Sequence, residues 1–382
     1  MALTRGRRAV VILITVIVAV VGLAGGAVAW HVATASLYSA AYNTETSSAR
    51  RLVTALDDRT SAVAQGKSTV VGAQTFLGRA RPAYVPVAAF TALKQKSDAL
   101  HTTVAAVRPV KAPADRSFVP NVATVALPWD TLITTYQLVD RQKANVAAVH
   151  AATHDTAVVN AALDDVLTAN TAVWGDIRAT ANTTLAGDTL ATYQSQIGLK
   201  HALAAVADST TNPQFVGRGM LATITAIETV RASQAAGEAA KADPAYPIHA
   251  EIEAYARSIS HGVHLDFVWA HTVNGKGDGW LSGTTQAWSE DGGWAIISLN
   301  FNVADYWSDG QDARALVAHE VGHSQAIRVA CRPLYSGPVF DSNDEMWATA
   351  WSISMGFDVP GSGIEAYGRP TDQQIATAAK CR

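Results

Sequence analysis

The sequence predicts an α+β protein made of an N-terminal transmembrane helix, a mainly α-helical extracytoplasmic region and a C-terminal domain with a small antiparallel sheet. Three observations support this prediction. An apolar run extends from Ala9 to about Trp30, helical spacing recurs in the alanine- and threonine-rich residues 34–242, and β-rich runs precede a histidine-bearing helix within residues 243–382. We therefore expect domains at residues 1–33, 34–242 and 243–382.

The N-terminus has the charge pattern of a membrane anchor. Residues 1–8 contain three arginines and no acidic residue. The apolar run that follows is long enough, at about 1.5 Å per residue, to cross a hydrocarbon core of roughly 30 Å. The arginines would stay in the cytoplasm, which predicts a single-pass protein of the cell membrane whose later domains lie outside. The alternative is a secreted protein with a cleaved signal peptide, because residues 27–29 (AVA) and 33–35 (ATA) resemble cleavage sites.

Residues 34–242 are expected to form several helices. Two apolar stripes have helical spacing: Leu132, Tyr136, Val139 and Val146, and then Val159, Leu163, Val166, Val173 and Ile177. Proline-bearing breaks at residues 81–86, 108–120 and 212–213 separate the helices. We expect an antiparallel bundle or elongated helical hairpins.

Three β-rich runs follow, at residues 263–270, 284–289 and 294–300. The last two are separated by Glu-Asp-Gly-Gly, a turn signal, and so predict a hairpin. A proline-free helix should follow from residue 313 to residue 330, opened by a capping box of Ser308 and Gln311. Its one poor helix former is Gly322, whose small size would let another segment approach closely.

This expected helix carries the motif H-E-x-x-H as His319, Glu320 and His323. Histidines four residues apart project from one helix face, so both imidazoles can reach one metal ion. A catalytic zinc usually has three protein ligands. Glu345, at the start of the next expected helix, is the candidate for the third; the alternative is that it only completes a capping box with Ser342.

The pattern resembles the gluzincin branch of the zincin metallopeptidases, in which H-E-x-x-H is followed by a glutamate on the next helix. The resemblance covers residues 245–382 and implies that His319, His323 and Glu345 bind Zn²⁺. The chain departs from the best-known members at two positions. Thr349 stands where they carry an acidic residue that supports a zinc histidine, and Gln325 stands where they carry a hydrophobic residue.

The resemblance implies an extracytoplasmic zinc metallopeptidase acting on a peptide or protein substrate. Glu320 would be the general base that takes a proton from a zinc-activated water. Tyr335 is the candidate for oxyanion stabilisation, with Tyr367 and Arg369 as alternatives. Two other functions stay open: a non-catalytic binding or sensor protein of the cell envelope, and a hydrolase of cell-wall peptide crosslinks.

Composition adds two expectations. The net charge is only −3 and no basic stripe occurs, so the sequence gives no indication of a nucleic-acid partner. The chain has two cysteines, Cys331 and Cys381, both on the exported side of the predicted anchor. A disulfide between them is expected, and two free thiols or a bridge between chains are the alternatives.

Overall fold

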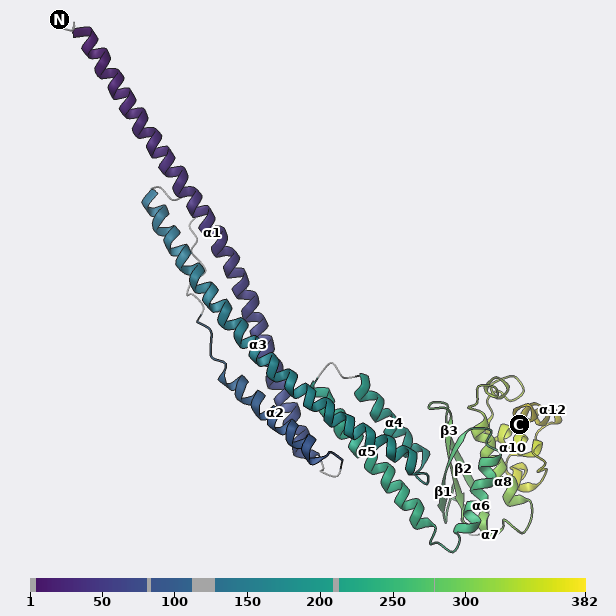
Figure 1. The fold of residues 1–382 in the computed structure, drawn as a ribbon. Coiled ribbons are helices and arrows are strands. Elements are labelled where there is room, and N and C mark those ends of the chain that lie inside the picture. Colours follow the sequence, from purple (N-terminus) through teal and green to yellow (C-terminus); the bar gives the residue numbers. More distant parts are fainter. Residues whose placement is uncertain (1–4, 81–83, 112–127, 209–212, 278) are drawn as a thin grey trace. The chain divides into compact units, whose positions relative to one another are not determined.

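The computed structural model describes residues 5–80, 84–111, 128–208, 213–277 and 279–382 (Figure 1). The chain divides into two compact units. Unit 1 comprises Met1–Trp174 and Asn212–Gly217, and unit 2 comprises Gly175–Thr211 and Arg218–Arg382. Unit 2 therefore contains the whole segment in which the metal-binding motif was found.

Unit 1 is built from α1 (Arg5–Arg79), α2 (Val87–Ala106) and the first part of α3 (Pro128–Gly187). In the contacts between α1 and α3, residues with higher numbers on one helix meet residues with higher numbers on the other. Ser48 Oγ accepts a hydrogen bond of 3.1 Å from Asn145 Nδ2, and Arg59 pairs with Asp155 at 2.8 Å. The two helices are therefore parallel, which corrects the expected antiparallel bundle. Helix α2, which lies between them in the sequence, runs in the opposite direction.

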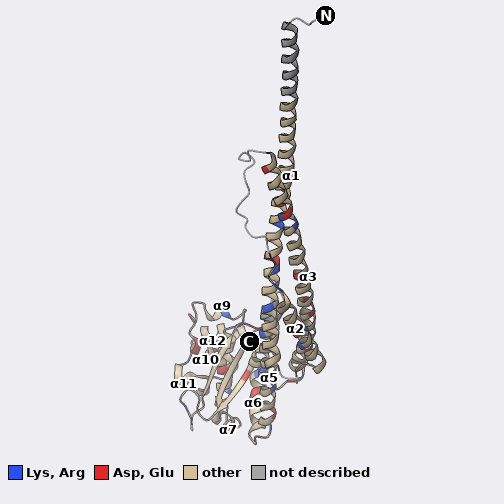
Figure 2. Cartoon of the chain, turned by 90° about the vertical axis from the view of Figure 1, so that its left-hand side faces the viewer, with Lys and Arg blue, Asp and Glu red and all other residues tan. Residues whose placement is uncertain are grey.

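The buried face of α3 in unit 1 repeats every seven residues, as in a coiled coil. It includes Leu138, Asn145, Ala152, Val159, Val166 and Val173. The second predicted stripe is thus confirmed, and the first is wrong, because Tyr136 is 67% exposed and Val146 41% exposed. The apolar pattern missed the true face there because a polar residue, Asn145, occupies it. Acidic and basic residues are interspersed along these helices (Figure 2).

The predicted transmembrane helix is not found. Within the part of the chain that the structure describes, no helix is long and apolar enough to cross a membrane. From Leu23 onward α1 also includes charged residues such as Glu45 and Arg51. Residues 1–4 and the side chains of residues 5–22 lie outside the described part. This finding corrects the predicted anchor at residues 1–33, together with the membrane partner and the single-pass localisation inferred from it.

Unit 2 begins with helices and continues into the segment that bears the motif. It contains the end of α3, α4 (Tyr193–Asp208), most of α5 (Pro213–Ala240) and α6 (Tyr246–Ser258). The first turn of α4 is attached to the sheet through Asp266, whose carboxylate accepts hydrogen bonds from the backbone N–H groups of Tyr193 (2.7 Å) and Gln194 (2.9 Å). Unpaired N–H groups at a helix start favour such a carboxylate.

The sheet has three strands, β1 (His264–Ala270), β2 (Gly283–Trp288) and β3 (Trp294–Asn300), in the order β1-β3-β2. The predicted hairpin is confirmed, since β2 and β3 pair antiparallel. The sheet as a whole is mixed rather than antiparallel, because β1 pairs parallel with β3. Residues 271–282 carry the chain from β1 to the far edge, so that β3 returns between the other two strands. The chain is therefore mostly helical with a small mixed sheet, which corrects the predicted fold class.

Short helices complete unit 2. They are α7 (Asn302–Asp305), α8 (Asp312–Gln325), α9 (Arg332–Tyr335), α10 (Asp344–Ser354), η2 (Pro360–Ser362), α11 (Ile364–Tyr367), α12 (Asp372–Ala378) and η3 (Ala379–Cys381). Helix α8 packs against β2 and β3, and α10 packs on α8. The core between them contains Ile297, Leu299, Val321, Trp347 and Trp351, all buried. This core fixes the position of α8, which carries the H-E-x-x-H motif.

Candidate metal centre

Helix α8 holds both histidines of the motif on one face. It begins at Asp312 and ends at Gln325, five residues earlier than predicted at residue 330. The expected capping box does not form, because the N-cap residue Gln311 makes no side-chain capping hydrogen bond. Instead, Asp312 Oδ1 accepts a hydrogen bond of 2.8 Å from the backbone N–H of Gly361, which attaches the η2 loop to the start of α8.

Helix α10 supplies the third candidate ligand because it approaches α8 closely at Gly322. A Cβ on Gly322 would lie 3.0 Å from Ala348 Cα, so only glycine leaves room for the contact. Trp347 Nε1 donates a hydrogen bond of 3.0 Å to the Gly322 carbonyl. The prediction that Gly322 admits a neighbouring segment is confirmed, and the contact brings Glu345 to the two histidines.

Three ligand atoms converge on one point. His319 Nε2 lies 3.1 Å from Glu345 Oε2 and 3.1 Å from His323 Nε2, and His323 Nε2 lies 3.4 Å from Glu345 Oε2. A tetrahedral zinc ion with bonds of about 2.0–2.1 Å separates its ligand atoms by about 3.3 Å. The three residues could therefore hold one metal ion.

The contacts of the two Nδ1 atoms leave both Nε2 atoms directed toward the point where a cation could bind. His319 Nδ1 donates a hydrogen bond of 2.9 Å to the Ser362 carbonyl, so its Nε2 carries the lone pair. His323 Nδ1 lies 2.9 Å from Asp344 Oδ2, within ion-pair distance although not aligned as a hydrogen bond. When both imidazoles are neutral and carry their proton on Nδ1, two nitrogen lone pairs and a carboxylate oxygen face one another, which is the form that could bind a cation. Outward contacts of this kind orient histidine ligands in metal sites.

The pKa shifts also favour positive charge at this point. Burial alone would lower the pKa of His323, but contacts with Asp344 and Glu345 and the charge of Glu320 outweigh it and raise this pKa to about 10. Burial alone would raise the pKa of Glu345, but the contacts and charges of the two histidines hold it well below its usual range. Without a metal, the His323 imidazole therefore keeps its positive charge near neutral pH.

Helix α8 is also approached by the loop that contains η2 and α11. Gly363 has φ +101°, and a Cβ there would lie 2.6 Å from Thr349 Oγ1 and 2.9 Å from His319 Nδ1. The ring of Tyr367 stacks on His319 at a centroid distance of 5.9 Å. Burial and the nearby Glu345 raise the pKa of Tyr367 to about 12, so its hydroxyl keeps its proton beside the cluster.

Glu320 lies outside the ligand set and faces strand β2. Its side chain is 3% exposed, and its Oε2 accepts a hydrogen bond of 2.8 Å from Thr285 Oγ1. A Cβ at Gly283 would lie 2.7 Å from Glu320 Oε1, so the glycine makes room for this carboxylate. Two alternate residues of an edge strand therefore fix the Glu320 side chain beside the candidate ligands.

The other two predicted oxyanion residues have different contacts. The Tyr335 hydroxyl donates a hydrogen bond of 3.0 Å to the Ser342 carbonyl, and its ring packs edge-on against Trp347. Arg369 pairs with Asp358 at 2.9 Å and with Asp372 at 3.2 Å. Tyr335 thus fastens the turn that leads into α10, and Arg369 stabilises the loop after α10.

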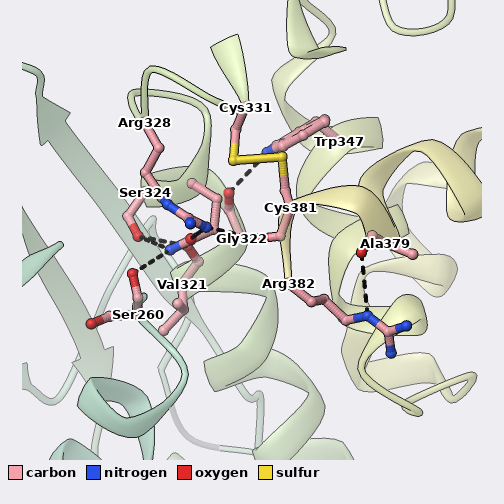
Figure 3. The surroundings of a disulfide bond; sticks show 11 residues. Ser260, Val321, Gly322, Ser324, Arg328, Cys331, Trp347, Ala379, Cys381 and Arg382 are labelled. Atoms are coloured by element: carbon pink, nitrogen blue, oxygen red, sulfur yellow. Dashed lines mark hydrogen bonds between the residues drawn. A yellow bond between two sulfur atoms is a disulfide. The ribbon is translucent and has the colours of Figure 1, made fainter. Parts of the chain in front are cut away.

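The two cysteines are joined in a disulfide, as predicted, with a Cα–Cα distance of 5.6 Å (Figure 3). Arg328 supports this connection by donating hydrogen bonds to Gln325 Oε1 (2.8 Å) and the Cys381 carbonyl (2.7 Å). Gln325 Nε2 donates to the Ser260 carbonyl at 3.2 Å. The polar residue that departs from the gluzincin pattern therefore anchors the end of α8 to two other segments.

Several residues of the site were not identified from the sequence. They are Gly283, Thr285, Asp344, Ser362 and Gly363. Asp344 directly precedes the predicted ligand Glu345, and a carboxylate at this position could have been predicted to contact one of the histidines. Ser362 acts through its backbone carbonyl, which leaves no trace in the residue pattern. Thr349 stands 3.4 Å from His319 Nδ1 but does not replace the missing acidic residue; Asp344 supplies a carboxylate to the other histidine instead.

Comparisons of the chain with protein-family models, with curated proteins and with solved structures find no match. The resemblance to gluzincins therefore depends on the sequence motif alone.

Proposed function

We propose that the protein is a zinc-dependent peptidase of gluzincin type that uses Glu320 as its general base. The observation that carries this proposal is the convergence of His319, His323 and Glu345 on one point, with the buried Glu320 carboxylate held beside them by Thr285. Two imidazole nitrogens and one carboxylate oxygen are a common ligand set for catalytic zinc. When bound there, zinc supplies Lewis acidity, which activates water and polarises a carbonyl group.

Glu320 has the environment of a proton acceptor. It is buried, and its side-chain partner Thr285 is a hydroxyl donor, which occupies one carboxylate oxygen and fixes the direction of the group. In the proposed reaction Glu320 takes a proton from the attacking water and gives it to the leaving amine. A side chain fixed in this way needs little reorganisation during the reaction.

Tyr367 is better placed than Tyr335 to donate a hydrogen bond to a developing oxyanion. Its ring stacks on His319, and its hydroxyl keeps its proton because its pKa is raised to about 12. The Tyr335 hydroxyl donates to the Ser342 carbonyl, whereas the Tyr367 hydroxyl interacts with the candidate ligand Glu345 and so lies at the cluster itself. Strand β2 adds a place for the substrate backbone, because it is an edge strand of the sheet and lies against α8.

The test is peptide hydrolysis by the purified, zinc-loaded chain against a mixed set of fluorogenic peptides. The expected result is cleavage that falls at least about a hundredfold in kcat/KM in Glu320→Gln, because a positioned general base contributes on this scale. Glu320→Gln should still bind zinc, since Glu320 is not among the candidate ligands. A zinc-loaded wild type that cleaves no peptide, or a Glu320→Gln variant as active as wild type, would overturn the proposal.

A further inference from the structure

A groove of about 400 Å³ opens beside His323. It is lined by Thr285, Ala287, His323, Ala326, Ile327, Arg332, Tyr335, Ser336 and Asp344. Its walls thus come from the edge strand β2, from the end of α8 and the turn after it, from α9 and from the start of α10. A peptide lying along β2 with its scissile bond at the candidate metal centre would place a neighbouring side chain in this groove.

Arg332 is the one lining residue with an uncommitted charge. Within the described part of the chain, its guanidinium forms no hydrogen bond or ion pair. The groove has one acidic residue, Asp344, whose carboxylate lies 2.9 Å from His323 Nδ1. Because that carboxylate is already engaged by the imidazole, the charge left for a ligand in the groove is the positive charge of Arg332.

The backbone that carries Arg332 is firmly attached. Arg332 follows Cys331, which is disulfide-bonded to Cys381. It opens α9, where Pro333 occupies the first turn and the Tyr335 ring packs against Trp347. A cation on an anchored turn loses less conformational freedom on binding than one on a mobile loop, so it discriminates better between ligands.

We propose that Arg332 makes this groove a subsite for a carboxylate of the peptide substrate, next to the scissile bond. The guanidinium presents two parallel N–H donors that match the two oxygens of a carboxylate. Ala287, Ala326 and Ile327 give the groove apolar walls beside the exposed Arg332, against which the aliphatic part of a substrate side chain can pack. This proposal rests on the proposed peptidase function and names its substrate class: peptides with an acidic side chain or a free C-terminal carboxylate at that position.

The test uses a peptide that the wild type cleaves, acetylated and amidated, with Glu, Gln or Lys in turn at each of the positions flanking the scissile bond. At one position, kcat/KM for Glu should exceed that for Gln by roughly threefold to thirtyfold, the range of a well-formed charged pair. Arg332→Ala should abolish the preference and Arg332→Glu should reverse it in favour of Lys. Arg257→Ala, which removes an exposed arginine outside the groove, should leave the preference unchanged.

Two further measurements identify which carboxylate the groove binds and whether the preference appears in binding as well as in turnover. The Gln peptide is also compared with a free C-terminal carboxylate and as its C-terminal amide. If the wild type prefers the free carboxylate and Arg332→Ala does not, the groove binds the C-terminus rather than an acidic side chain. Binding of the same peptides to zinc-loaded Glu320→Gln gives a readout that does not depend on turnover, and the Glu-over-Gln ratio should match that in kcat/KM.

The outcomes distinguish the two proposals. Equal cleavage of Glu and Gln peptides at every position, with no preference for a free C-terminus, would overturn the Arg332 subsite and leave the peptidase intact. A carboxylate preference that survives in Arg332→Ala would do the same. A wild type that cleaves no peptide, together with a Glu320→Gln variant that binds none, would overturn the peptidase and the subsite together.

Discussion

Nδ1 of His323 lies 2.9 Å from Oδ2 of Asp344, the residue directly before the third candidate ligand. The first turn of α10 therefore provides both a candidate ligand, Glu345, and a carboxylate within ion-pair distance of another candidate ligand, His323. Because Asp344 and Glu345 are adjacent at the start of α10, a substitution at either residue should lower metal affinity strongly.

Asp344→Asn should weaken zinc binding by about tenfold to a hundredfold, because loss of a carboxylate that orients a histidine ligand has effects of this size. Competition with a chelator of known affinity measures the change. Asp309→Asn is the matched control, since Asp309 is exposed and lies outside the cluster. Equal zinc affinity in wild type and Asp344→Asn would show that the Asp344 contact does not orient His323.

Gly363→Ala should reduce zinc affinity at least about tenfold, because the new methyl group would displace His319 from its contact with Ser362. The methyl carbon would lie only 2.6 Å from Thr349 Oγ1 and 2.9 Å from His319 Nδ1. Gly368→Ala is the control, since Gly368 also has positive φ (+84°) but nothing within 4 Å of an added Cβ. Both variants should lose about 1–3 kcal/mol of stability from backbone strain, but only Gly363→Ala should bind zinc more weakly.

Removal of the disulfide should destabilise unit 2 by roughly 2–5 kcal/mol, the usual range for a native bridge. The bridge closes a loop between positions 50 residues apart and ties the C-terminus to the segment after α8. Urea unfolding of a Cys331→Ser/Cys381→Ser variant, followed by tryptophan fluorescence, measures the change because Trp347 and Trp351 are fully buried. Reduced wild type should unfold at the same urea concentration as this variant, and an unchanged midpoint in both would contradict the prediction.

The metal-free protein should lose stability as pH rises from about 7 toward 10. The pKa of His323 in the folded state is raised to about 10, above the value of about 6.5 expected for an unfolded histidine. Its contribution is therefore fully present below about pH 6.5 and is lost as pH rises through about 10. Urea unfolding in the presence of a chelator at pH 7, 8, 9 and 10 measures the decline. His323→Gln should show a smaller decline over the same range, and an identical slope in both proteins would contradict the assignment.

The sequence was sufficient to predict the three candidate ligands that the structure brings together. His319 and His323 share a face on any α-helix, and Glu345 lies at the start of α10. The hairpin of β2 and β3 was also readable from its Gly-Gly turn. Contacts that depend on tertiary placement could not be predicted, such as the Ser362 carbonyl against His319, since no side chain marks them.

The larger errors have the same origin. Strand runs indicate pairing but not direction, so the sequence predicts an antiparallel sheet although β1 lies parallel to β3. Similarly, the true contact face of α3 contains Asn145, a polar residue that apolar spacing does not reveal. In both places the arrangement depends on partners distant in the chain, which residue periodicity does not identify.

The three-ligand centre can be tested through the zinc content of the purified protein, measured by elemental analysis after loading and dialysis. We predict about one zinc ion per chain in the wild type and in Glu320→Gln, because one set of three ligands binds one ion. We predict almost none in His323→Ala and Glu345→Ala, which each remove a ligand. A wild type without zinc, or a Glu345→Ala variant with full zinc content, would contradict the three-ligand centre.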